Sequence, residues 1–452
     1  MGSTPARAPP PGTPALSDDD RRELSGRIGP LAAAFTRAGH RFFLVGGLVR
    51  DTLLGHGLTG DIDITTDAIP DQIAQLVAGW ADTVWEQGKA FGTIGARRKD
   101  TAVEITTHRA ESYDSGSRKP HVRFSDDIVT DLGRRDFTVN AMAIEVPGWT
   151  LYDPFGGLAD LANGVLRTPS EPEGLFSDDP LRMLRAARFS AQLALAPTQE
   201  LVTAIRGMRP RLAIVSRERI GTELTKLLEL PRPSAGVRFL ADTGLLGDLL
   251  PPWQQSGTAV PAPGFDAVGD LDERVEIRWA ILLGLVCDDE ATAARCLSAL
   301  RIRGATIQGV IAIGRAARAL QTASADAAAS GGGGPDTGRP VARRLVADHG
   351  PQLDAATATV TAWDGSLSET FVRLLAEVQT AEGEALRRLP VDGHRVMEVL
   401  GRSGPVVGEA LAWLRNQQIE HGPLSSERAC ALLAEWDRRR PQSGTGAFEA
   451  AH

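Results

Sequence analysis

The chain has 452 residues, of which 42% are hydrophobic and 23% are charged, and its formal net charge is −8. This composition is ordinary for a globular protein of about two to four domains. Its three scattered cysteines, Cys287, Cys296 and Cys430, exclude a disulfide framework and lack zinc-site spacing. No apolar run reaches membrane-spanning length, so we expect a cytoplasmic protein that does not associate with membranes.

The N-terminal part of the chain predicts a mixed α/β domain over residues 18–160. Residues 1–17 are rich in Pro, Ala and Gly, and we expect them to form a disordered arm. A helix is expected from Asp18 to Arg37, with acidic residues in its first turn, and another over Asp71–Trp80. Short apolar or β-branched runs predict strands at Phe42–Val45, Ile62–Thr65, Thr83–Trp85, Thr93–Ala96, Ala102–Thr106 and Ala143–Val146.

The first candidate site combines an apolar strand, a glycine pair and two carboxylates one residue apart. Because side chains alternate along a strand, Asp61 and Asp63 should share a face, where their oxygens suit Mg²⁺. Gly46 and Gly47 would let the backbone approach a phosphate, and Arg50 would add a cationic fork. Each part alone also fits an ordinary turn or loop, so the prediction depends on their order along the chain.

Glu104 is the candidate third carboxylate, because its predicted strand could lie beside that of Asp61. The alternative is the polar face of an ordinary half-buried strand. The segment that follows, residues 109–123, is rich in Gly, Ser, Lys and Arg and contains Tyr113. We expect this segment to be a mobile loop.

A second candidate site is the segment Arg134–Ala141. If it opens a helix, Asp136 and Asn140 share a face while Phe137 turns toward the core. A carboxylate beside an amide can form hydrogen bonds with a ribose, including its 2′-hydroxyl. The alternative is that Asp136 caps the helix and that the preceding arginines are surface charges.

A third candidate site lies in the segment Asp178–Phe189. Pro180 suits the first position of a helix, which makes Asp179 a natural N-cap. Asp179 and Arg182 together could instead recognise the amino group and adjacent ring nitrogen that cytosine and adenine share. Arg185 and Arg188 lie with Arg182 on the side of the helix away from its apolar stripe.

The remainder of the chain is predicted to be helical. Residues 182–238 contain eleven Lys or Arg and four Glu, a net charge of +7, which suits a nucleic-acid backbone or a solvated helical surface equally. Within this stretch, Arg217, Arg219 and Lys226 are candidate RNA contacts, and Arg219 is expected to pair with Glu223 one turn later. The expected divisions are a neck (161–235), a body (236–321), a flexible linker (322–340), a tail (341–440) and a disordered end (441–452).

Together these motifs resemble the polymerase-beta nucleotidyltransferase superfamily, and most closely its class II tRNA nucleotidyltransferases and bacterial poly(A) polymerases. The resemblance is dense over residues 42–228 and weaker over 389–433. The segment from Arg134 resembles the family motif Arg-Arg-Asp-x-x-x-Asn-Ala, which implies sugar and triphosphate contacts for Arg135, Asp136 and Asn140. The segment from Asp178 resembles Glu-Asp-x-x-Arg, the base template of the family, with Asp178 in place of the glutamate.

The resemblance implies an α/β head with a small mixed sheet, followed by an all-α neck, body and tRNA-binding tail. It also implies addition of CCA to tRNA 3′ ends from CTP and ATP, by two-metal transfer with Mg²⁺ and release of pyrophosphate. The alternatives are a poly(A) polymerase, disfavoured because residues 87–93 lack a basic run, and a non-catalytic RNA-binding protein. The chain has no His-Asp doublet, so we expect a body without a second metal site and predict no protein partner.

Overall fold

A computed structural model describes most of the chain, and it divides the chain into two compact units, residues 1–260 and 261–452. The described residues are 16–58, 61–112, 121–269, 271, 274–329, 335–363 and 367–440. Gly60, Tyr113 and most of the two predicted disordered ends lie outside these residues. The predicted division into head, neck, body and tail is finer than the two units and stays a prediction.

The first unit contains the predicted α/β region and the helices that follow it. Its elements up to the last sheet strand are α1 (Asp18–Arg37), β1 (Phe43–Val45), α2 (Gly47–Leu53), β2 (Ile62–Thr66), α3 (Pro70–Ala78), β3 (Thr83–Trp85), η1 (Lys89–Phe91), β4 (Thr93–Arg98), β5 (Thr101–Thr107), β6 (Arg109–Ser112), β7 (His121–Phe124), α4 (Ile128–Gly133), η2 (Thr138–Asn140), β8 (Ala143–Glu145) and β9 (Thr150–Tyr152). The elements that follow are α5 (Gly157–Ala162), β10 (Val165–Leu166), α6 (Pro172–Asp178), α7 (Arg182–Leu193), β11 (Ala196–Pro197), α8 (Gln199–Met208), η3 (Arg209–Ile214), α9 (Arg217–Leu228), α10 (Ser234–Asp242), α11 (Leu245–Leu249) and α12 (Pro251–Ser256).

A seven-stranded mixed sheet with the order β3-β4-β5-β2-β1-β8-β9 organises this unit. All neighbouring strands are antiparallel except β2 and β5, which run parallel and pair Asp63 with Glu104. The six predicted strands are therefore confirmed, and the seventh, β9, extends the sheet beyond β8. The parallel pair matters for the site because it brings two acidic side chains to one face of the sheet.

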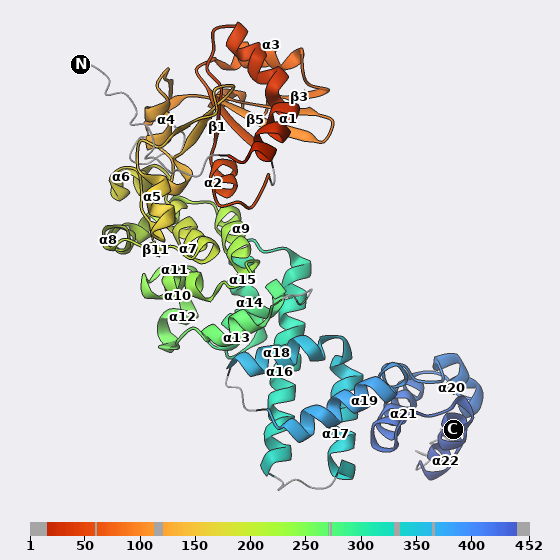
Figure 1. Ribbon diagram of the computed structural model, residues 1–452. Coiled ribbons are helices and arrows are strands. Elements are labelled where there is room, and N and C mark those ends of the chain that lie inside the picture. The colour runs from red at the N-terminus through yellow and green to blue at the C-terminus, as the bar shows by residue number, and fades with distance from the viewer. Residues whose placement is uncertain are drawn as a thin grey trace, which may run out of the picture. The chain divides into compact units, whose positions relative to one another are not determined.

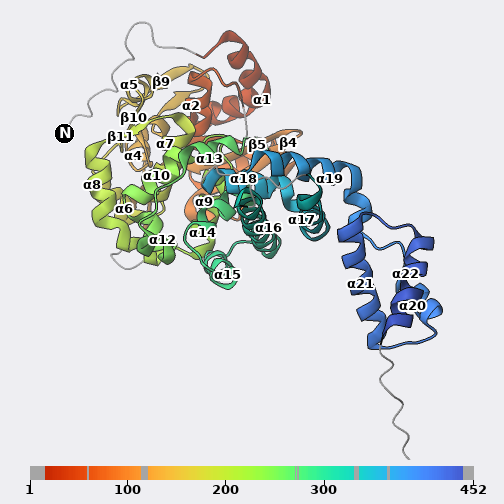
Figure 2. The same cartoon turned by 90° about the horizontal axis from the view of Figure 1, so that it is seen from below.

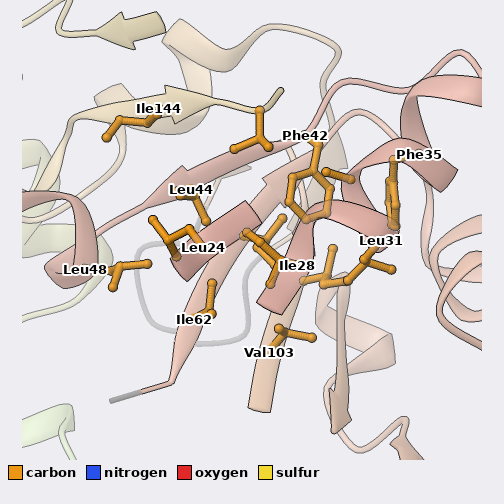
Figure 3. Close-up of a cluster of buried hydrophobic side chains, with 14 of the residues drawn as sticks. Leu24, Ile28, Leu31, Phe35, Phe42, Leu44, Leu48, Ile62, Val103 and Ile144 are labelled. Atoms are coloured by element: carbon orange, nitrogen blue, oxygen red, sulfur yellow. The ribbon is translucent and has the colours of Figure 1, made fainter. Parts of the chain in front are cut away.

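One face of the sheet packs against α1 and α3 (Figure 1). Figure 3 shows α1 side chains such as Leu24 and Phe35 packed against Phe42, which directly precedes β1, and against strand residues such as Ile62. The predicted arm extends two residues too far, because Leu16 is buried in this core and Ser17 caps α1 by accepting a hydrogen bond from the Asp20 N–H. An apolar side chain next to an N-cap is fixed by packing that composition does not reveal.

The opposite face packs against α4 through a smaller apolar cluster that includes Phe43, Val45 and Leu132. Of the segment predicted as a mobile loop over residues 109–123, the two ends form the paired antiparallel strands β6 and β7, and residues 113–120 lie outside the described residues. Backbone pairing between two polar strands leaves little trace in apolar patterning, which explains the wrong prediction. The hairpin leads directly into α4.

The second unit is helical. Its helices are α13 (Ala262–Ala267), α14 (Arg274–Gly284), α15 (Glu290–Ala299), α16 (Gly304–Ala329), α17 (Pro335–His349), α18 (Leu353–Trp363), α19 (Glu369–Arg387), α20 (Gly393–Leu400), α21 (Pro405–His421) and α22 (Ser426–Arg439), with a 3₁₀ turn, η4 (Gly350–Gln352), before α18. The last three helices share their own apolar cluster and stand together in Figure 2 (blue). None of the helices within the described ranges has the length and apolarity that a bilayer crossing needs.

The predicted flexible linker over residues 322–340 is largely wrong. α16 continues to Ala329 and α17 begins at Pro335, so only residues 330–334, which lie outside the described residues, separate the two helices. The alanines of this segment explain the difference, because alanine has the highest helix propensity and needs no apolar stripe to extend a helix.

We expect Gly157→Ala to lower the free energy of unfolding by about 1 to 3 kcal/mol. Gly157 in α5 packs closely against the backbone of Thr138 in η2. A Cβ atom on Gly157 would lie 2.2 Å from the backbone oxygen of Thr138, so α5 would have to move away from η2. The matched control is Gly174→Ala in α6, where a Cβ meets nothing within 4 Å and alanine favours the helix. Urea unfolding of both variants tests this, and equal midpoints for the two would contradict it.

Candidate active site

The acidic part of the site is built on β2 and β5. Asp61 immediately precedes β2 and Asp63 lies within it, and both side chains are exposed while Ile62 between them is buried. Glu104 on β5 is exposed and stands opposite Asp63 in the parallel register. Paired residues on neighbouring strands point to the same side, so Glu104 and Asp63 face the same space.

Gly46 lies where the acidic and basic parts of the site meet. Its φ of +74° suits glycine, and a Cβ atom here would lie 3.4 Å from both Asp63 Oδ2 and Arg135 Nη1. Although Asp63 has solvent-accessible surface, many protein atoms surround its carboxylate, and this desolvation raises the pKa of Asp63; Arg135 opposes this shift, and Glu104 and Asp61 add to it. The site is therefore a group of carboxylates that a cation would stabilise.

Arg135 is held beside Asp63 by a buried carboxylate. Asp131 in α4 is fully buried, and its Oδ2 accepts a hydrogen bond from Arg135 Nη2 at 3.3 Å while its Oδ1 accepts one from Arg134 Nη2 at 2.8 Å. Burial alone would raise the pKa of Asp131, but the two arginines lower it to about 2. Asp131 was not among the predicted site residues, although its position four residues before Arg135 in a helical pattern could have suggested the pair.

A second hydrogen-bond network links Arg50 to Asn140 and Asp136, the two residues predicted to contact a ribose. Arg50 is buried, and it donates to both carboxylate oxygens of Asp51 and, at 2.7 Å, to Asn140 Oδ1. Asn140 Nδ2 in turn donates to Asp136 Oδ1 at 3.0 Å. The guanidinium of Arg50 is thus occupied by neighbouring side chains, and its predicted contact with phosphate stays a prediction.

Asp136 ends this network in an ion pair that buries its own carboxylate. Its Oδ2 accepts a hydrogen bond from Arg185 Nε at 2.8 Å, and Arg185 Nη2 lies 2.6 Å from the same oxygen. Burial alone would raise the pKa of Asp136, but Arg185 and Asn140 bring it below its ordinary value. The predicted helix over this segment is wrong: Phe137 is extended and only a 3₁₀ turn follows, yet Asp136 and Asn140 still meet.

The candidate base-reading residues lie around the start of α7. Asp179 Oδ1 accepts a hydrogen bond from the Leu181 N–H, while Arg182 is buried and donates to the backbone oxygens of Leu175 and Arg134. The helix begins at Arg182 rather than at the predicted Pro180, because Asp179 satisfies the preceding N–H group from outside the helix. The structure brings Asp179 and Arg182 to one turn, but each binds other groups.

The ion pair predicted between Arg219 and Glu223 is wrong. Arg219 Nη2 donates to Asp179 Oδ2 at 2.8 Å, and Glu223 accepts a hydrogen bond from Arg188 Nε. Both residues of α9 therefore reach across to the α6–α7 segment, because a buried or half-buried partner in tertiary contact outcompetes a solvated pair within one helix. Arg217 and Lys226, the other predicted RNA contacts, are exposed on α9.

The carboxylates fit a hard divalent cation in the chemistry of their oxygen atoms. Across the described ranges, no three His, Cys, Asp or Glu side chains are gathered as a metal-binding cluster, so Asp61, Asp63 and Glu104 do not form a complete ligand set. A cation such as Mg²⁺ usually takes one or two carboxylates and completes its shell with phosphate oxygens and water. Asp61 and Asp63 fit that pattern, with Gly46, the residue before α2, beside Asp63.

Comparisons with known proteins agree with this geometry. Residues 42–167 match the Poly A polymerase head domain, and residues 195–255 match a family described as a probable RNA and SrmB-binding site of polymerase A. The CCA-adding enzymes of Geobacillus sp. (strain WCH70) and Bacillus subtilis (strain 168) are 33% and 37% identical to this chain, covering 88% and 90% of it and 93% and 96% of their own lengths. The crystal structure of the Bacillus stearothermophilus CCA-adding enzyme in complex with CTP is similar at a TM-score of 0.68, with 27% identity, over 92% of this chain and 98% of that chain.

We expect Asp131→Asn to destabilise the protein in a pH-dependent way. The pKa of Asp131 is about 2 in the folded state, against an ordinary value of 3.8, so its ionisation stabilises the fold above about pH 4. This contribution, about 2 kcal/mol, is lost as the pH falls from 4 toward 2.

Urea unfolding at pH 7 and at pH 3 measures the effect. The difference between Asp131→Asn and the unmodified protein should shrink at the lower pH, while Asp126→Asn, an exposed neighbour, should leave the midpoint unchanged. A difference that stays the same at both pH values would contradict the assigned role of the Asp131 charge.

Proposed function

This chain belongs to the family of CCA-adding enzymes, and from that membership we propose that it adds cytidine and adenosine nucleotides to the 3′ end of tRNA, using CTP and ATP. The observation that carries the proposal is the meeting of Asp63 and Arg135 at Gly46, with Glu104 opposite Asp63 on the neighbouring strand. Carboxylates for a metal and a cation for a triphosphate then lie at one point, next to a glycine that leaves room for the ligand.

We propose Mg²⁺ as the cofactor, with Asp61 and Asp63 as its protein ligands. The family of polymerase head domains typically uses divalent metals. When bound, such an ion supplies charge stabilisation for the triphosphate and lowers the pKa of an attacking hydroxyl. Arg135 would lie against the triphosphate, and its fixed charge would offset the negative charge that develops as pyrophosphate leaves.

Asp136 and Asn140 are proposed to face the ribose, and Asp179 with Arg182 the base. Asp136 is fixed by Arg185 and Asn140, so its remaining hydrogen-bonding capacity is preorganised. A nucleotide base would have to share or replace the hydrogen bond from Arg219 to Asp179, a pair in which Arg219 is exposed and Asp179 is half-buried. A cytoplasmic location stays a prediction.

The decisive experiment supplies a tRNA that lacks its terminal CCA with each nucleotide separately and then with both. We expect incorporation of two cytidines from CTP alone, none of adenosine from ATP alone, and the complete terminus from the mixture. Long adenosine tails from ATP alone would indicate a poly(A) polymerase. Binding of tRNA with no incorporation of CTP would indicate a non-catalytic RNA-binding protein.

Replacing Asp61 and Asp63 together with Ala should lower the rate of nucleotide transfer by at least about a thousandfold, because their oxygens are proposed to bind the metal. The affinity for tRNA should be unchanged, since neither residue lies on the basic helices. Asp100→Ala, an exposed aspartate in the β4–β5 turn, is the matched control and should transfer nucleotides normally. Normal transfer by the double variant would refute the metal assignment.

A further inference from the structure

One aromatic ring lies among three arginines beside the candidate nucleotide site. Phe189 in α7 is 5% exposed, and its ring centroid lies 4.2 Å from the guanidinium carbon of Arg188, 5.4 Å from that of Arg50 and 5.5 Å from that of Arg185. Phe137, next to Asp136 in the chain, makes an edge-to-face contact with the same ring at 5.7 Å. The ring of Phe189 therefore contacts Phe137, which follows Asp136 in the chain, and the arginines Arg185 and Arg188 of α7.

Three cations around one ring would repel one another without compensation. Each guanidinium has a carboxylate of its own: Arg50 pairs with Asp51, Arg185 with Asp136 and Arg188 with Glu223. Each carboxylate offsets the charge of its arginine, and the electron-rich face of the Phe189 ring attracts the guanidinium groups that surround it. An aliphatic side chain of similar volume could fill this space but would not attract the guanidinium groups.

We propose that Phe189 is a positioning residue for nucleotide binding: its ring sets the orientation of Arg50 and Arg185, and through them that of Asn140 and Asp136. This inference rests on the proposed function, because it assigns the ring to the nucleotide that the site binds. Both arginines donate directly to the two residues proposed to face the ribose. Because Phe189 is buried, it acts through these side chains and does not itself stack on a base.

The test compares Phe189→Leu, Phe189→Tyr and Phe35→Leu. The leucine variant removes the aromatic face and keeps apolar bulk, whereas tyrosine keeps the face. Phe35→Leu is the matched control, because Phe35 is fully buried in the α1 core, where its ring contacts that of Phe42. All three are measured for urea midpoint, for CTP affinity without tRNA, and for KM and kcat of nucleotide addition.

We expect Phe189→Leu to weaken CTP affinity and raise the KM for CTP and ATP by about tenfold, as loss of one desolvated cation–π contact would. Phe189→Tyr should retain most of the affinity. Phe35→Leu should lower the urea midpoint and leave both CTP affinity and KM unchanged.

An unchanged CTP affinity and KM in Phe189→Leu would overturn the proposal, as would a tyrosine variant as weak as the leucine variant. The wild-type protein separates this failure from that of the proposed function. If it adds no nucleotide to tRNA, CCA addition is refuted, whereas the comparison of CTP affinity between wild type and Phe189→Leu still decides the role of the ring.

Discussion

The ion pair between the buried carboxylate of Asp136 and the half-buried guanidinium of Arg185 is the interaction on which the rest of the site depends. It joins the segment before η2, which leads into strand β8 of the sheet, to α7 in the helical part of the first unit. The Asp136 carboxylate could not remain buried without this cation, because an unpaired buried ion costs several kcal/mol. The pair therefore holds the segment of Asp136 against α7, and a nucleotide that spans the sheet carboxylates and the proposed base-reading turn would meet both parts already in place.

The hydrogen-bond network around Asp136 consists of side chains that share partners rather than of isolated ion pairs. Asn140 accepts a hydrogen bond from Arg50 and donates one to Asp136. The orientation of its amide group is therefore fixed by a cation on one side and an anion on the other. On the other side, Asp131 fixes Arg135 beside Asp63. Such networks are stable only when every member has a partner, and then they allow few alternative arrangements. The network consists mainly of arginine and carboxylate groups, whose planar geometry restricts the angles at which they bind.

The sequence predicts the elements of this molecule better than the partners of its charged side chains. Apolar and β-branched runs identified six of the seven sheet strands, and acidic residues in the first turn identified α1, since each of these features lies within a few consecutive residues. The partners of Arg219 and Glu223 could not be predicted in this way, because Asp179 and Arg188 lie 40 and 35 residues away in the chain. The rule that residues four apart in a helix pair with each other cannot predict contacts that arise only when α9 packs against α7.

The same limit applies to the basic stretch over residues 182–238. Its net charge of +7 suggests a continuous surface for a phosphate backbone, but several of its arginines are used inside the fold. Arg182 and Arg211 donate to backbone oxygens, and Arg185 and Arg188 pair with buried carboxylates. Exposed basic residues lie instead on α9 and α10, where they include Arg217, Lys226 and Arg238, and also at Arg206 on α8 and Arg232 between α9 and α10. An RNA backbone is attracted mainly by exposed cationic side chains within a short distance, because salt screens charges that lie further away. The arginines of α7 that are paired with carboxylates are already neutralised. The electrostatic contribution to RNA binding should therefore come from the exposed residues rather than from α7.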